Sequence, residues 1–181
     1  VGSNKNSIKI IGNYTEKYAQ AYFAYDSKKS GGLTVSHLRF GDTPIKSSYL
    51  IDTADFVACH NPSYVTRYDM VSDLKEGGAF LLNCEWTSVE ALEKELPAKM
   101  KNILAKKHAK LYVIDAIKIA GELGLRGKTS TILQSAFFCI NPQIMPYESE
   151  NPEDKNTAVA LMKYMAYKSF SRKGDAIVQM N

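Results

Sequence analysis

The chain has 181 residues, a length that fits one α/β domain and can bury a sizeable apolar core without a metal or a disulfide. A hydrophobic fraction of 45% and a charged fraction of 23% are those of an ordinary globular protein. The net charge of +4 is too small for a dedicated nucleic-acid binder, and no apolar run has the length of a membrane span. We therefore expect neither nucleic acid nor membrane among its partners.

The cysteines Cys59, Cys84 and Cys139 lie far apart, each in an apolar run, and no CxxC pair is present. Buried free thiols in a reducing compartment are the simplest interpretation. Together with the missing signal-peptide pattern, this predicts a cytoplasmic location or an organelle with a reducing interior. Without a CxxC pair, we expect no iron–sulfur cluster or zinc site built from this chain alone.

The first patterned segment, residues 7–11 (SIKII), fits either a strand or a helix, because so short a run has no decisive period. As a helix, it could be capped by Ser3 or Asn4 and ended by Gly12. In residues 18–26 and 33–40, aromatic or apolar residues alternate with other residues, and this pattern predicts two strands. The segment SKKSGG between them predicts a hairpin.

Further along, short apolar runs that predict buried strands alternate with stretches that predict helices. The strands are expected at 55–60, 79–84 and 110–115, the middle one after a break at Gly77-Gly78. The helices are expected at 62–70, 88–96, 98–108 and 116–125; Thr87, with Glu90 at capping-box spacing, or Ser88 caps the second. This order is typical of a parallel βαβ array.

Two more helices are expected, at 129–140 with Thr129 or Ser130 as cap, and at 157–170. The predicted fold class is α/β, with three α/β/α layers around a mostly parallel, mixed sheet that includes the hairpin at its front. We interpret residues 1–181 as a single α/β domain excised from a longer, multidomain polypeptide.

Two segments have features that can hold a phosphate, namely positively charged side chains or accessible backbone N–H groups. In SKKSGG, Lys28 and Lys29 precede Ser30 and two glycines, so ammonium groups and backbone N–H groups meet in one turn. A solvated hairpin turn is the alternative, since lysines keep strand edges soluble. In VGSNKNS, Gly2 at a helix start is a second, weaker anion-binding candidate.

No catalytic residue and no metal site are expected. His37, His60 and His108 are too scattered to form a metal set, and neither a nucleophile motif nor a glycine-rich nucleotide fingerprint occurs. His60 ends a predicted strand, where α/β sheets place ligands, but a packed or solvent-facing histidine is the favoured interpretation. Arg172, in the closing SRKG, could reach an anionic ligand or serve as a surface residue.

Several stretches together resemble the γ-type domain of pyruvate:ferredoxin (flavodoxin) oxidoreductase. They are GSNKNSIKIIG, YDSKKSGGLTVSHLRFG, ADFVACHNPSYV, YVIDA and TILQSAFF. The resemblance covers Val1 to about Pro146 and continues loosely into the final helix. It implies that the first segment is a helix and that the family's first strand and glycine-rich loop lie just upstream.

The resemblance also implies a reaction for the whole enzyme: pyruvate and coenzyme A give acetyl-CoA and carbon dioxide, with electrons passed to ferredoxin or flavodoxin. Thiamine diphosphate, Mg²⁺ and [4Fe–4S] clusters would be held by other domains of the same polypeptide, in an enzyme expected to be a homodimer. This domain alone would be inactive and would contribute to the coenzyme A site. A purely structural scaffold, or the equivalent domain of another 2-oxoacid oxidoreductase, is the alternative.

The coenzyme-A-binding residues that the resemblance implies come from four separate segments. Val1, Gly2, Lys28 and Lys29 would lie near the phosphates of the nucleotide. Ser130 would add a polar contact where relatives often carry asparagine, a longer side chain with more donors. Arg172 would be a further phosphate partner.

Overall fold

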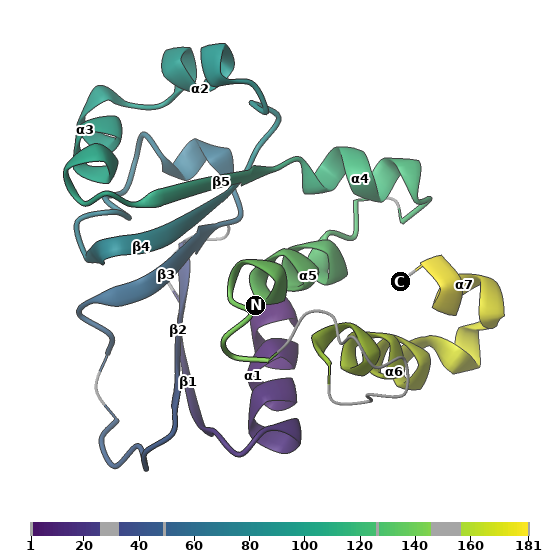
Figure 1. Cartoon of the computed structure of the whole chain (residues 1–181). Helices are drawn as coiled ribbons and strands as arrows, with labels where there is room; N and C mark the ends of the chain where they lie inside the picture. Colours follow the sequence, from purple (N-terminus) through teal and green to yellow (C-terminus); the bar gives the residue numbers. More distant parts are fainter. Residues whose placement is uncertain (1, 26–32, 49, 126, 146–156, 181) are drawn as a thin grey trace. The chain divides into compact units, whose positions relative to one another are not determined.

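The computed structural model describes residues 2–25, 33–48, 50–125, 127–145 and 157–180 (Figure 1). The chain divides into two compact units. Unit 1 consists of Val1–Ile51 and Leu123–Asn181, and unit 2 of Asp52–Glu122. Helices and strands occur in both, which confirms the α/β class. The single domain 1–181 stays a prediction.

Unit 1 contains an antiparallel hairpin and several helices. Its elements are α1 (Gly2–Tyr14), β1 (Tyr18–Tyr25), β2 (Thr34–Gly41), α5 (Ser130–Ile140), α6 (Ala158–Phe170), the 3₁₀ turn η2 (Ser171–Lys173) and α7 (Asp175–Met180). The ambiguous first segment is therefore a helix, as the resemblance implied. Its buried residues, Ser3, Ser7, Ile10 and Ile11, recur every three or four positions and form one helix face.

The core of unit 1 gathers around Ile10, Ile11 and Phe138, whose side chains are fully buried. Residues from α6 and from the turn after α5 complete this cluster. The hydroxyl of Thr157 caps α6 by accepting a hydrogen bond from the Ala160 N–H at 3.1 Å. Apolar burial thus joins the two stretches of chain that make up unit 1.

In the hairpin, Tyr18 pairs with Gly41 at one end and Tyr25 with Thr34 at the other. The end of α1 packs on the start of β1, since a Cβ placed at Gly12 would lie 3.5 Å from that of Ala19. The hairpin forms a two-stranded sheet of its own rather than joining the parallel strands in one mixed sheet.

Unit 2 is a parallel sheet in the order β3-β4-β5 with its connecting helices. Its elements are β3 (Ala54–Cys59), the 3₁₀ turn η1 (Pro62–Tyr64), β4 (Leu74–Asn83), α2 (Val89–Glu95), α3 (Ala98–Lys106), β5 (Lys110–Ile114) and α4 (Ala116–Glu122). The predicted βαβ array is confirmed from β4 onward. Phe80 and Leu82, both fully buried, lie at the centre of its core.

The helix expected at 62–70 is wrong, because only the single turn η1 forms there. After that turn, the Asp69 carboxylate accepts hydrogen bonds from the N–H groups of Val71 and Ser72. The hydrogen bond from the Ser72 hydroxyl, with these backbone donors, lowers the pKa of Asp69 to about 2. This local cap makes a turn more favourable than a second helical turn.

The break expected at Gly77-Gly78 is also wrong, because β4 begins earlier, at Leu74, and runs through both glycines. The partner on β4 shifts from Leu74 opposite Ala54 to Ala79 opposite Phe56, which marks a bulge. Gly77 has a φ of 70°, and a Cβ at Gly78 would lie 2.9 Å from the Lys75 carbonyl oxygen. The glycines therefore shape the strand instead of ending it.

The structure also shows which residue caps α2 and which cysteines are buried. Ser88, not Thr87, caps α2, and its hydroxyl accepts a hydrogen bond from the Ala91 N–H at 3.2 Å. Cys59 and Cys84 are buried as predicted, but Cys139 is exposed on α5. The prediction for Cys139 was wrong because an apolar run on an amphipathic helix still has an outer face.

Candidate ligand-binding site

The described candidates Gly2 and Ser130 each begin a helix, and those two helices are tied together. The side-chain amide of Gln134, in the second turn of α5, donates a hydrogen bond to the Ser7 hydroxyl in the second turn of α1, at 3.3 Å. Both side chains are buried, so the bond is shielded from water. The structure thereby brings the first halves of α1 and α5 together.

The first residues of both helices, Gly2 and Ser130, are exposed. A Cβ placed at Gly2 would meet no described atom within 4 Å. Ser130 is exposed, and its neighbour Thr129 makes no capping hydrogen bond through its side chain to the described residues. N–H groups at a helix start carry partial positive charge and suit an anion.

Lys28, Lys29 and Val1 lie outside the described residues. The end of β1, which precedes the lysine segment, is described, and one contact ties it to the beginning of α1. The Lys5 ammonium lies over the Phe23 ring, 5.4 Å from its centroid, and Phe23 is close to the end of β1. Because the end of α1 meets the start of β1 and Lys5 contacts Phe23, helix and strand run in opposite directions, and the described end of β1 lies on the side where α1 begins.

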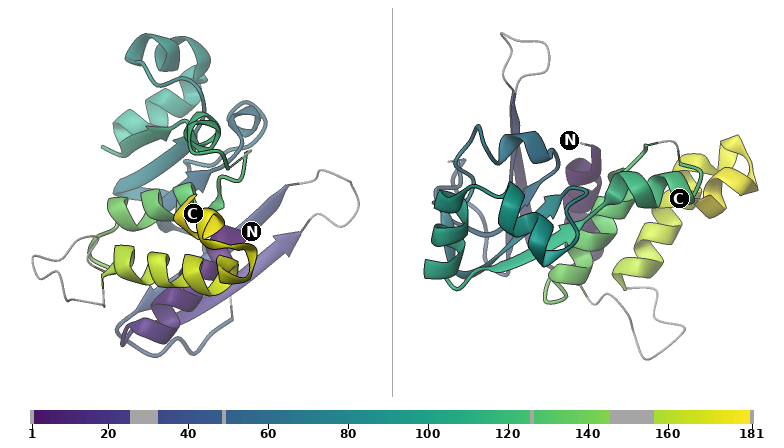
Figure 2. Two further views of the ribbon diagram at one scale, coloured as in Figure 1. Left: turned by 90° about the vertical axis from the view of Figure 1, so that its right-hand side faces the viewer. Right: turned by 90° about the horizontal axis from the view of Figure 1, so that it is seen from above.

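Arg172 is exposed in η2, directly after α6. Helices α5 and α6 lie side by side and run in opposite directions (Figures 1 and 2). Ser135 contacts the Met162 sulfur at 3.6 Å between them. The end of α6 therefore lies on the side of unit 1 where α5 begins, so Arg172 and Ser130 share that side.

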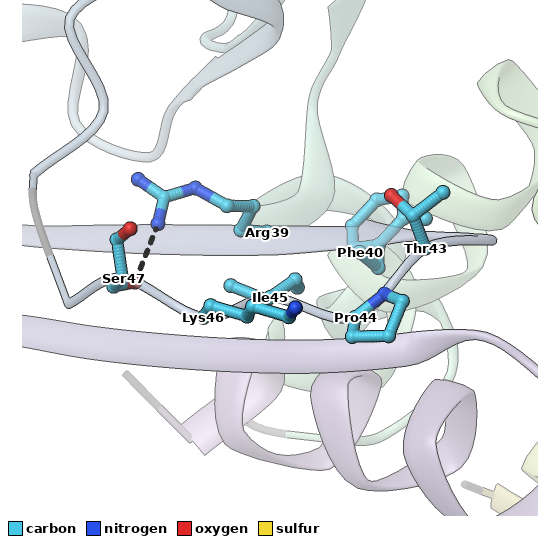
Figure 3. Close-up of a pocket in the computed structure, with 8 residues that line it drawn as sticks. Arg39, Phe40, Thr43, Pro44, Ile45, Lys46 and Ser47 are labelled. Carbon is cyan, nitrogen blue, oxygen red and sulfur yellow. Dashed lines mark hydrogen bonds between the residues drawn. The ribbon is translucent and has the colours of Figure 1, made fainter.

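A cavity of about 370 Å³ adjoins the hairpin, lined by Arg39, Phe40 and Gly41 and by residues 43–47 (Figure 3). Arg39 donates hydrogen bonds to the side-chain oxygen of Gln20 at 2.9 Å and to the Ser47 carbonyl at 3.4 Å. Its guanidinium thus braces the loop against the strands. No sequence motif pointed to this cavity, and Arg39 has a structural role there.

At the carboxyl ends of the strands of unit 2, the polar groups bind one another. The Asn83 amide donates to the His60 carbonyl at 3.1 Å, and its oxygen accepts from the Ala116 N–H at 3.0 Å. Burial raises the pKa of the Cys59 and Cys84 thiols, which keeps them protonated and poorly reactive at neutral pH. At this sheet edge the hydrogen bonds of Asn83 stabilise the fold, and the two thiols are poor nucleophiles.

The described residues contain neither a metal-binding cluster nor a membrane-spanning helix. No group of at least three His, Cys, Asp or Glu side chains among them is placed to hold a metal ion. Within the same residues, none of the helices has the length and apolar character required to cross a membrane.

Residues 1–181 match the family described as pyruvate ferredoxin/flavodoxin oxidoreductase. The chain belongs to this family. It is 52% identical to the pyruvate:ferredoxin oxidoreductase of Moorella thermoacetica and 51% identical to the pyruvate-flavodoxin oxidoreductase of Klebsiella pneumoniae. The alignments cover the whole chain but only 15% of each relative, so the chain spans about a seventh of their length.

Relatives with a different name and a solved structure also match the chain. The pyruvate dehydrogenase [NADP(+)] of Cryptosporidium parvum is 46% identical over the whole chain, which covers 9% of that protein. Among solved structures, the PORC subunit of the Thermotoga maritima pyruvate oxidoreductase matches with a TM-score of 0.67 at 19% identity, over 99% of this chain and 84% of that one. At that identity, the match supports the fold.

Proposed function

We propose that this chain is the coenzyme-A-facing domain of a pyruvate:ferredoxin or pyruvate:flavodoxin oxidoreductase. The observation that carries the proposal is the Gln134–Ser7 hydrogen bond, which holds the helix starts at Gly2 and Ser130 in one part of unit 1. The Lys5–Phe23 contact joins α1 to β1, the strand that precedes Lys28 and Lys29 in the sequence. Val1 precedes Gly2, and Arg172 follows α6 on the side where α5 begins.

The role of the domain in this proposal is binding and orientation. Ammonium groups and helix N–H groups neutralise and hold the phosphates of coenzyme A, while its thiol reaches the reacting centre in another domain. The reaction proposed for the full enzyme converts pyruvate and coenzyme A to acetyl-CoA and carbon dioxide. Electrons leave to ferredoxin or flavodoxin.

The remaining parts of the proposal concern the rest of the polypeptide. Other domains would hold thiamine diphosphate, Mg²⁺ and [4Fe–4S] clusters. The full enzyme would be a homodimer in the cytoplasm or in an organelle with a reducing interior. Thiamine diphosphate would supply the chemistry of decarboxylation. This chain would contribute neither a redox centre nor a catalytic side chain.

The test uses the full enzyme with Lys28 and Lys29 both replaced by alanine. We expect the KM for coenzyme A to rise about tenfold or more, because two cations that contact phosphate are lost. The KM for pyruvate and the binding of thiamine diphosphate should not change. Lys106→Ala with Lys110→Ala, two exposed lysines of unit 2, removes the same charge and is the matched control.

An unchanged KM for coenzyme A in the Lys28→Ala/Lys29→Ala enzyme would refute the coenzyme A role and favour the scaffold. A second measurement separates these two functions independently of mutation. Coenzyme A should protect Lys28 and Lys29 of the wild-type enzyme from chemical acylation. A pure scaffold predicts the same labelling with and without coenzyme A.

A further inference from the structure

Lys5 joins the start of α1 to the hairpin, although it was not among the site residues expected from the sequence. Its ammonium lies 5.4 Å from the centroid of the Phe23 ring, within the range of a cation–π interaction. Phe23 is two residues before Tyr25, the last residue of β1. The contact therefore places a positive charge between the first turn of α1 and the strand end from which the lysine segment departs.

The charge of Lys5 opposes the electrostatics of its own helix. A helix start carries partial positive charge and favours acidic residues, whereas the first turn of α1 contains no acidic residue and does contain Lys5. The side chain is exposed, and no carboxylate within the described part of the chain forms a salt bridge with it. A lysine here costs helix stability, and a bound anion would reverse that cost.

We propose that Lys5 is an additional phosphate-binding residue of the coenzyme A site and that Phe23 positions its ammonium. This rests on the coenzyme A role proposed above. An aromatic face restrains a lysine without neutralising it, unlike a carboxylate, so the full charge stays available to a phosphate. Lys5 thus adds a cation from the first turn of α1 to those of Lys28 and Lys29.

The decisive variant is Lys5→Met in the full enzyme, which keeps an unbranched side chain and removes the charge. We expect the KM for coenzyme A to rise about fivefold, the effect of one partly exposed charge pair, with kcat and the KM for pyruvate unchanged. The KM should also depend less steeply on salt. Lys5→Arg keeps the cation and its stacking on Phe23 and should restore the wild-type KM.

Lys9 provides the matched control. It is exposed on α1 one turn after Lys5, so Lys9→Met makes the same change in net charge farther from the helix start. We expect Lys9→Met to leave the KM for coenzyme A unchanged. Equal effects of Lys5→Met and Lys9→Met would mean that only the overall charge matters, and would overturn the proposal.

Phe23→Leu tests the positioning role. We expect a smaller rise in the KM for coenzyme A than with Lys5→Met, and no further rise when the two changes are combined, because Phe23 acts through Lys5. Additive effects would overturn this part. If Lys28→Ala/Lys29→Ala raises the KM and Lys5→Met does not, the inference fails while the coenzyme A role stands; if neither raises it, both fail.

Discussion

The two units of this chain differ in how closely their residues follow the rules that stabilise a fold. In unit 2, buried polar groups bind one another, as Asn83 does with the His60 carbonyl and the Ala116 N–H. In unit 1, Lys5 opposes the electrostatics of α1 while a ring holds it in place. Each described residue of the proposed site, namely Gly2, Lys5, Ser130 and Arg172, belongs to unit 1.

This difference indicates which unit carries the proposed binding site. Proteins obey local folding rules through most of their length and depart from them where a ligand later restores the balance. Unit 2 follows those rules at the cap of α2 and at the glycine bulge. Unit 1 departs from them at the first turn of α1, where the anion is proposed to bind.

The largest effect is expected for Asn83→Ala. It leaves the buried Ala116 N–H and the His60 carbonyl without their partner, which should lower the free energy of unfolding by about 2–3 kcal/mol. The KM for coenzyme A should be unchanged in the folded enzyme. Denaturant unfolding and steady-state kinetics of the full enzyme measure both; a raised KM would break the division between the units.

A smaller loss of stability is expected for Ser88→Ala, at about 1 kcal/mol, because the N-cap of α2 is removed. Thr87→Ala is its neighbour control and should stay within about 0.5 kcal/mol, as surface substitutions usually do. Thermal unfolding of the two variants decides which residue is the cap. Equal losses would contradict the assignment of Ser88.

The smallest effect has the opposite sign. Asn4→Asp introduces an acidic residue into the first turn of α1 and should raise the free energy of unfolding by about 0.3–1 kcal/mol. The same carboxylate should repel phosphate and raise the KM for coenzyme A. Asn13→Asp, near the end of α1, should lower stability and spare the KM; a rise in both stability and coenzyme A affinity for Asn4→Asp would refute the contrast.

Much of the fold could be predicted because its signals are local and repeated. The apolar runs of β3, β4 and β5 and the alternation in the hairpin are recognisable without any tertiary contact. The helix expected from Pro62 failed because the carboxylate of Asp69 caps a turn. The bulge at Gly77-Gly78 could not be predicted either, because glycine in a strand and glycine at a break look alike in sequence.

For the site, the sequence and the family resemblance supplied Gly2, Ser130 and Arg172 as separate candidates. Their relation depends on the Gln134–Ser7 bond, which no spacing in the sequence reveals. Lys5 is part of VGSNKNS, a segment that the sequence had already indicated as an anion-binding candidate. Its positive charge at a helix start is the sequence feature that could have identified it. Its contact with Phe23 is tertiary and needed the structure.

The interrupted chain of unit 1 has a consequence for how the protein is made. Ser7 and Gln134 are 127 residues apart, and the continuous unit 2 lies between them in the sequence. At a ribosomal rate of roughly 5–20 residues per second, about 6–25 s separate their synthesis. During that interval α1 lacks the helix that covers its buried face, so the nascent chain exposes Ile10 and Ile11 to chaperones until α5 emerges.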